Sequence, residues 1–220
     1  QLISFTNSTT FLEQLNVSEK ELPIANGMLI NLETGVIRER VKSDLFNFNL
    51  NVTITEDKTF PNVKKFITSV FGDDPEMYNY MRYLIGYCLT GEITERSLYV
   101  AWGTGRNGKS TFFKLLDKIM GRYFTSLSES VLSVDTSKGG ATPELQSIVG
   151  CRLGVLSEND EKEQVLNASR VKRLTGDDKI TYRPLYEKER SFTPKIKMWL
   201  LCNLKPIINI SDQAMTDRVK

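Results

Sequence analysis

The sequence contains no histidine and only three cysteines among its 220 residues. A catalytic triad that uses histidine is therefore excluded. A structural zinc site needs about four Cys or His ligands, and Cys88, Cys151 and Cys202 lie far apart with no histidine to complete such a set. Scattered thiols of odd number are typical of a reducing compartment, where they act as small buried hydrophobic residues.

Long apolar runs are also missing. No run approaches the roughly 18 residues of a membrane-spanning helix, and the first residues do not resemble a signal peptide, so we expect no membrane partner. Charge of one sign is not in excess, since 29 Lys+Arg face 27 Asp+Glu. This balance argues against a polyanion-coating protein but is compatible with a local basic stripe. The chain starts at Gln1 and stops at Lys220, and we expect it to be a fragment of a longer protein.

Residues 1–91 predict a small α+β lead-in. Gly27–Val41 alternates apolar and polar residues around Glu33-Thr34-Gly35, which is typical of a β-hairpin, and a second extended stretch follows at 46–54. The spacing of apolar residues predicts helices over Asn62–Gly72 and from Pro75 to near Gly91. The core side of the second helix is predicted to contain Met77, Met81, Leu84, Tyr87 and Cys88.

Residues 92–220 alternate strands and helices, so we predict an α/β domain with a mainly parallel sheet and a boundary near residue 92. A strand begins at Leu98 and leads through a glycine-rich loop into a helix. The other predicted elements are a short helix at 142–149, strands at 152–157 and 195–203, a helix at 168–175, and two extended runs around a polar turn between 179 and 195.

Residues 103–110 match the pattern G-x-x-x-x-G-K-[ST] in full. Glycines let successive backbone N–H groups curl around phosphate oxygens, and the following helix directs its N-terminus at the same anion. A glycine-rich turn that only connects two elements is the alternative, but the position between a strand and a helix favours nucleotide binding. We predict ATP and Mg²⁺ as ligands, with Lys109 at the β/γ-phosphates and Ser110 at the metal. The predicted nucleotide-binding residues are Gly103, Thr104, Gly105, Arg106, Asn107, Gly108, Lys109, Ser110 and Thr111.

Polar residues follow two of the predicted strands. Glu158 comes directly after the strand at 152–157 and is the best candidate for the acid that supports Mg²⁺ and the attacking water. Asp160 is an open alternative, and a solvated acidic turn is another. Asn203 ends the last apolar strand, where α/β sheets bind ligands, although an asparagine there also serves as a turn or helix cap.

A basic segment with interleaved aromatics lies between these two positions. Tyr186, Lys188 and Arg190 fall in or beside its predicted turn and are candidates for contact with a nucleic acid backbone. A plain solvated hairpin is the alternative, because Glu187 and Glu189 oppose the basic charge. Arg218 on its own indicates only a surface arginine.

These segments occur in the order NGMLINLETG, FGDDPEMYNYMRYLIGYCLTG, WGTGRNGKST, RLGVLSE, VKRLTGDDKITYRPLYEKERSFTPKIKMWLLCN and DRVK. That order resembles the superfamily 3 helicase region of primase–helicases of poxvirus-like large DNA viruses and of phage and plasmid primases. The resemblance covers most of the chain from about Asn26 onwards. Its most specific pieces are GRNGKST and KRLTGDDKITYRPLY.

The resemblance implies a AAA+-type ATPase that works as a homo-hexameric ring on single-stranded DNA at a replication fork, with ATP sites between subunits. It further implies that Glu158 is the Walker B acid, Asn203 the sensor and Arg218 the arginine finger, with the segment around Lys188 as the DNA-tracking hairpin. Ser157 stands where many relatives have a first acid, which places more weight on Glu158. A primase module in the same parent chain and the cytoplasm of an infected host cell are implied as well.

Two other functions use the same nucleotide-binding loop. A small-molecule P-loop phosphotransferase needs neither the basic hairpin nor an arginine from another subunit. A nucleotide-gated DNA-binding or packaging scaffold binds ATP but hydrolyses it negligibly, and the intact Lys109, Ser110 and Glu158 argue against it.

Overall fold

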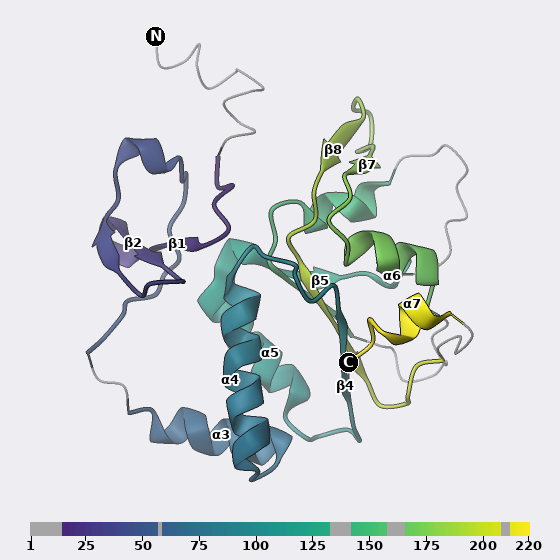
Figure 1. Ribbon diagram of the computed structural model, residues 1–220, viewed down its shortest axis with the longest axis horizontal. Coiled ribbons are helices and arrows are strands. Elements are labelled where there is room, and N and C mark those ends of the chain that lie inside the picture. Colours follow the sequence, from purple (N-terminus) through teal and green to yellow (C-terminus); the bar gives the residue numbers. More distant parts are fainter. Residues whose placement is uncertain (1–14, 57–58, 133–141, 158–165, 208–211) are drawn as a thin grey trace.

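The computed structural model describes residues 15–56, 59–132, 142–157, 166–207 and 212–220 (Figure 1). Glu158 and the alternative acid Asp160 lie outside these ranges. Within them, no helix is both long enough and apolar enough to cross a membrane.

A four-stranded parallel sheet forms the centre of the fold, as predicted. Its strands are β4 (Leu98–Trp102), β5 (Phe124–Leu127), β6 (Leu153–Ser157) and β9 (Lys197–Cys202), in the order β4-β9-β6-β5. All three pairings are parallel. The C-terminal residues run along the free side of β4, where Val100 N donates to Lys220 O at 2.8 Å.

Helices cover both faces of this sheet. Because side chains alternate between the faces of a strand, Tyr99 and Trp199 pack into one hydrophobic cluster, and Leu98 and Leu200 pack into the other. The first cluster contains residues of α3 (Pro61–Phe71), α4 (Pro75–Leu89) and α5 (Lys109–Met120). The second contains residues of α6 (Ala168–Leu174), α7 (Gln213–Thr216) and the 3₁₀ helix η5 (Pro143–Ile148). The lead-in therefore shares a core with the α/β segment.

The lead-in begins with a three-stranded antiparallel sheet of β1 (Glu21–Ile24), β2 (Met28–Asn31) and β3 (Ile37–Glu39). The predicted hairpin is confirmed as β2 and β3. The stretch at 46–54, predicted to be extended, forms no strand. Its backbone makes isolated bonds instead, such as Leu50 N to Pro23 O at 2.8 Å.

The two predicted helices of the lead-in are confirmed within two residues at each end. Gly72 ends α3 with a positive φ of 96°, and the Asp74 carboxylate caps α4 by accepting from Glu76 N at 2.8 Å. The predicted core position Met77 is wrong, because its side chain is 38% exposed. It lies in the first turn of α4, before the helix reaches the sheet.

Two buried cations attach the lead-in to the first residues of the central strands. Arg152, just before β6, donates to Ser18 O at 2.7 Å, to Glu21 O at 2.9 Å and to Leu89 O. Lys197, the first residue of β9, donates to Thr90 O and to Glu92 O. Both side chains are 2% exposed or less. All five acceptors are main-chain carbonyls of the lead-in and of the link to β4, and we call this group the carbonyl clamp.

Because the carbonyl clamp contains a buried lysine, we expect the free energy of unfolding to depend on pH. Burial lowers the pKa of the Lys197 ammonium from 10.5 to about 7, and Arg152 lowers it further while Cys88 and Glu92 oppose the shift. Between about pH 7 and 10.5 the unfolded chain therefore binds more protons than the folded one, so stability should rise with pH. The slope for one proton is at most about 1.4 kcal/mol per pH unit.

Hydrogen exchange of the β9 amides, corrected for the intrinsic pH dependence of exchange, measures this slope between pH 7 and 9. Burial raises the pKa of the Cys88 thiol from 9.0 to about 11, which acts in the opposite direction above pH 9. The slope should flatten in Lys197→Met and persist in Lys179→Met, whose side chain is exposed. An unchanged slope in Lys197→Met would contradict the assignment.

Candidate functional site: a phosphate-binding loop at the sheet edge

The glycine-rich loop leaves the carboxyl end of β4 and enters α5. Gly108 forms the N-cap of α5 with φ +85° and ψ −4°, and Arg106 has φ +62°. A left-handed conformation at these two places folds the loop back on itself. At Gly103 a Cβ would lie 2.7 Å from Asn107 Nδ2, so any larger residue there would displace the Asn107 side chain.

Lys109 and Asn203 meet at this loop. The Lys109 ammonium donates to Gly103 O, to Thr104 O at 3.4 Å and to Asn203 Oδ1 at 3.4 Å. Asn203 directly follows β9, which pairs with β4. All three acceptors are neutral, so the positive charge of Lys109 is not neutralised by them. The structure thus brings together two of the four predicted catalytic residues.

A pocket of about 310 Å³ lies over the loop. It is lined by residues 105–111 of the loop and α5, by Ser157, and by Leu201, Cys202 and Asn203. β4 and β9 are neighbours whose connections leave over opposite faces of the sheet, and such a crevice at the carboxyl ends of strands is where open α/β sheets bind ligands. Ser157 places the end of β6 at the pocket, and Glu158 follows it in sequence.

This pocket fits the phosphates of a nucleotide. Backbone N–H groups of a tight loop, a helix N-terminus and an ammonium that meets no carboxylate in the described part of the chain converge on one space. In the described ranges, no group of three or more His, Cys, Asp or Glu side chains could hold a metal ion. A Mg²⁺ that is shared with phosphates needs fewer protein ligands, and Ser110 lies in the pocket wall to provide one.

Trp102 is a residue of this site that the sequence patterns did not single out. It is the last residue of β4, and its indole Nε1 donates to Asn203 O at 3.1 Å. The Lys205 ammonium lies 4.5 Å from the centre of its ring. Trp102 therefore fixes the backbone that carries Asn203. An aromatic residue directly before the first glycine of the loop was the available signal.

Arg218 lies at the other end of β4. Its carbonyl accepts from Leu98 N at 2.8 Å, and its guanidinium donates to Thr175 Oγ1 at 3.2 Å and Ala214 O at 2.7 Å. A five-residue strand separates its first and last Cα atoms by about 13 Å. The fold thus does not bring Arg218 to the Lys109 of the same chain.

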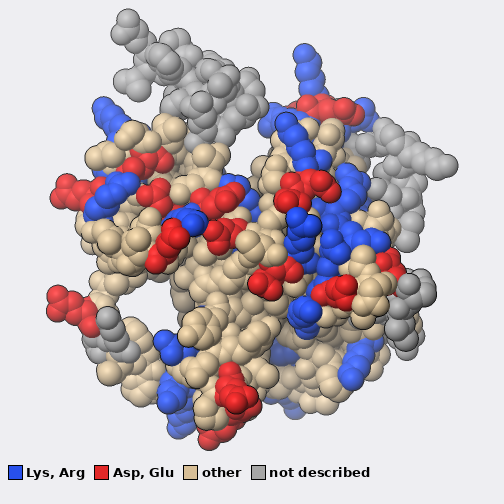
Figure 2. Space-filling view, in the orientation of Figure 1, with Lys and Arg blue, Asp and Glu red and all other residues tan. Residues whose placement is uncertain are grey.

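The predicted hairpin is confirmed as β7 (Ile180–Tyr182) and β8 (Arg190–Phe192), which pair antiparallel. Tyr186 in the connecting loop has φ +61° and is fully exposed. Lys188 is exposed as well, while Arg190 forms an ion pair with Glu187. Figure 2 shows Lys and Arg side chains gathered from the hairpin towards α6, with acidic side chains among them at the hairpin.

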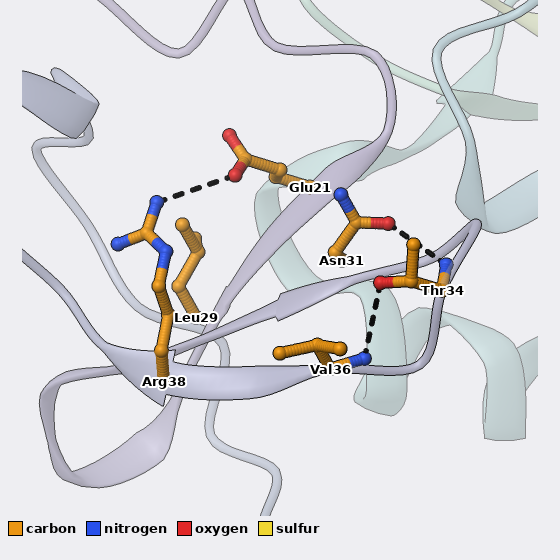
Figure 3. A pocket seen from close by; sticks show the side chains of 6 residues that line it. All are labelled: Glu21, Leu29, Asn31, Thr34, Val36 and Arg38. Carbon is orange, nitrogen blue, oxygen red and sulfur yellow. Dashed lines mark hydrogen bonds and ion pairs between the residues drawn. The ribbon is translucent and has the colours of Figure 1, made fainter.

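A second hollow, of about 240 Å³, lies on the antiparallel sheet (Figure 3). It is lined by Glu21, Leu29, Asn31, Thr34, Val36 and Arg38. Its polar groups are engaged with neighbours: Arg38 Nη2 lies 2.7 Å from Asp44 Oδ1 and 3.4 Å from Glu21 Oε1, and Asn31 Oδ1 accepts from Thr34 N. The hydrogen bond from Arg38 lowers the pKa of the Asp44 carboxyl to about 2. These contacts join Arg38 of β3 to Glu21 and Asp44, and they close the turn between β2 and β3.

The sequence model of a family described as "Family of unknown function (DUF5906)" matches residues 101–218, more than half of the chain. The chain belongs to the DUF5906 family. The matched residues of this DUF5906 chain contain the phosphate-binding loop, Asn203, the hairpin and Arg218.

Relatives of this DUF5906 chain include proteins of large DNA viruses. The chain is 32% identical over 215 residues to "Putative helicase L207/L206" of Acanthamoeba polyphaga mimivirus, a match that covers 96% of this chain and 22% of that protein. It is 27% identical to "Putative helicase 121R" of Invertebrate iridescent virus 3, over 98% of this chain and 24% of that protein. It is 26% identical to "Putative primase C962R" of African swine fever virus, over 57% of this chain and 13% of that protein. The resemblance stated from the sequence is confirmed, and the chain spans about a fifth of the length of its helicase-named relatives.

The fold of this DUF5906 chain is similar to that of a solved structure described as the apo NrS-1 C terminal region. The TM-score is 0.58 at 15% sequence identity, over 85% of this chain and 42% of that one. At this identity the likeness concerns the fold alone. It agrees with a mixed α/β architecture around a parallel sheet.

Proposed function

We propose that the chain is the ATP-driven motor segment of a DNA helicase that replicates a viral genome. The observation that carries this proposal is the contact of Lys109 with Asn203 in the wall of the pocket over the glycine-rich loop, in a chain whose relatives are named as helicases and a primase. Accordingly, we assign the fold to the superfamily 3 group of AAA+ P-loop ATPases. The protein would act in infected cells, together with a primase module in the same polypeptide.

The proposal assigns roles to the loop, to Ser110, Asn203 and Glu158, and to Lys109. Backbone N–H groups of residues 103–111 hold the phosphates, and Lys109 contacts the β- and γ-phosphates. Ser110 and Glu158 hold Mg²⁺, which neutralises charge on the phosphate oxygens when it is bound. Glu158 also orients the attacking water and accepts its proton, and Asn203 positions that water near the γ-phosphate.

Arg218 acts on the nucleotide of a neighbouring subunit in this proposal. Its distance from the Lys109 of its own chain supports a role in trans, because a guanidinium that stabilises charge on the γ-phosphate must reach the pocket. We therefore propose a hexameric ring with ATP sites between subunits. In that ring the β7–β8 hairpin contacts single-stranded DNA, which the exposed Tyr186 and Lys188 support.

The hairpin gives the first test of this function. DNA should stimulate ATP turnover in the full-length protein. Tyr186→Ala should weaken binding to single-stranded DNA by about 5- to 100-fold, since a stacked base contributes about 1–3 kcal/mol. Lys188→Ala should reduce the slope of log affinity against log salt, because one phosphate contact is lost. Turnover and DNA binding over a range of salt concentrations measure both effects.

The matched control is Lys118→Ala, which removes an exposed lysine on α5. It should change neither the affinity nor the salt slope. A monomer whose turnover ignores DNA and responds to a small acceptor would support the phosphotransferase instead. ATP binding with negligible turnover would support the scaffold.

A further inference from the structure

The lead-in helix α3 lies directly against the phosphate-binding loop. At Gly108 a Cβ atom would come within 2.8 Å of Val70 Cγ2 and 3.9 Å of Phe66 Cε2. Real Cβ atoms essentially never approach another heavy atom this closely, so the loop and α3 are in tight contact here. Two features favour glycine at position 108. Its φ of +85° lies in the left-handed region, and Val70 occupies the space that a side chain would need.

A second contact fixes α3 against the start of α5. The rings of Phe71 and Phe112 meet edge to face, with centroids 5.0 Å apart and an interplanar angle of 83°. Phe112 N donates to Gly108 O at 2.9 Å, so the same residue closes the first turn of α5 onto the loop. Ile67, one turn before Phe71, is 6% exposed and holds α3 in the core.

The loop depends on such support from outside. Arg106 is a non-glycine residue in the left-handed region, a strained conformation that persists only where the surroundings hold it. Phosphate binding requires the N–H groups on either side of Gly108 to point into the pocket, and a rotation at Gly108 would turn them away. The side of Gly108 that faces away from the pocket is occupied by Val70.

We infer that Val70 is a positioning residue for nucleotide binding, which holds Gly108 of the phosphate-binding loop from the lead-in helix α3. This inference rests on the proposed function for its ligand. It makes the lead-in part of the nucleotide site. Because linkage is reciprocal, bound nucleotide should in turn strengthen the docking of α3.

The test compares Val70→Ala with Val63→Ala in the full-length protein. Val63 lies on the same helix and is 43% exposed, so it is matched in residue type and helix. Titration with Mg·ATP should show about a 5-fold or larger loss of affinity for Val70→Ala, within the range of coupling between residues in contact. Val63→Ala should bind like the wild type. Equal affinities of the two variants would overturn the inference.

A double-mutant cycle separates positioning from a general loss of stability. Gly108→Ala should weaken ATP binding, and adding Val70→Ala to it should recover part of the loss, because the 2.8 Å clash is relieved while the φ strain remains. Val70→Ala would then be harmful beside Gly108 and helpful beside Ala at that position. Harm in both backgrounds would indicate a structural role and overturn the inference.

Hydrogen exchange measured without nucleotide tests the positioning role of Val70 separately from the proposed ATP binding. The amides of residues 108–110 should exchange faster in Val70→Ala than in Val63→Ala. If the wild type fails to bind ATP, the proposed function fails, while the exchange rates still decide whether Val70 holds the loop. Unchanged exchange in Val70→Ala would contradict the positioning role.

Discussion

Replacing Arg218 with alanine is expected to lower ATP turnover by about 10³-fold or more while ATP binding is retained. The guanidinium lies at the amino end of β4, bonded to Thr175 and Ala214, and the phosphate pocket lies at the carboxyl end. Loss of Arg218 therefore leaves the pocket of its own chain intact. Under the proposed function, the variant loses the stabilisation of transition-state charge on the nucleotide of the next subunit. Steady-state turnover and ATP titration measure the two quantities separately.

Mixing two inactive variants tests whether Arg218 acts in trans. Lys109→Ala subunits supply Arg218 to neighbours that carry Arg218→Ala, and those neighbours supply an intact loop. Mixed rings should therefore regain part of the turnover that each variant lacks. Arg96→Ala, which removes an exposed arginine paired with Asp177 on the surface, should retain turnover. Absence of recovery in mixtures that assemble would contradict the shared site.

The second large effect is expected for Glu158→Gln, with turnover lower by about 10²- to 10⁴-fold, the range of a positioned general base. Ser157 lines the pocket at the end of β6, and Glu158 is the next residue in the sequence. Glutamine keeps the size of the side chain and removes its charge and basicity. ATP binding should remain, because the loop and Lys109 are unchanged. Single-turnover hydrolysis and ATP titration check both parts.

Asp160→Asn is the matched control for this acid. It removes a carboxylate two residues further along and should leave turnover close to that of the wild type. The reverse pattern, a large loss in Asp160→Asn with a silent Glu158→Gln, would reassign the acid to Asp160. Full activity in both variants would be incompatible with a hydrolase that uses an acid from this strand.

The parts of the site that the sequence predicted are those with strong local requirements. The glycines of the loop and the apolar strand before Asn203 both act over a few residues. The contact of Lys109 with Asn203 follows from them, because neighbouring parallel strands end at one edge of a sheet.

Features that depend on distant partners were not predicted. β1 contains Pro23, which argues against a strand, but it is an edge strand and a proline is tolerated there. β5 is only four residues long and lies at the edge of the parallel sheet, paired with β6 alone. The contact of Val70 with Gly108 joins residues 38 positions apart in sequence, and neither residue alone indicates the other.

The carbonyl clamp has a consequence for how this protein can diverge. The hydrogen bonds that Arg152 and Lys197 donate to the lead-in and to the link before β4 are accepted by main-chain oxygens of Ser18, Glu21, Leu89, Thr90 and Glu92. Any amino acid presents such an oxygen, so substitutions at these five positions leave the attachment intact as long as the backbone path is kept. The side chains of the lead-in, which lies outside the residues matched by the DUF5906 family, can therefore change during evolution while the donors at Arg152 and Lys197 keep it attached to the parallel sheet.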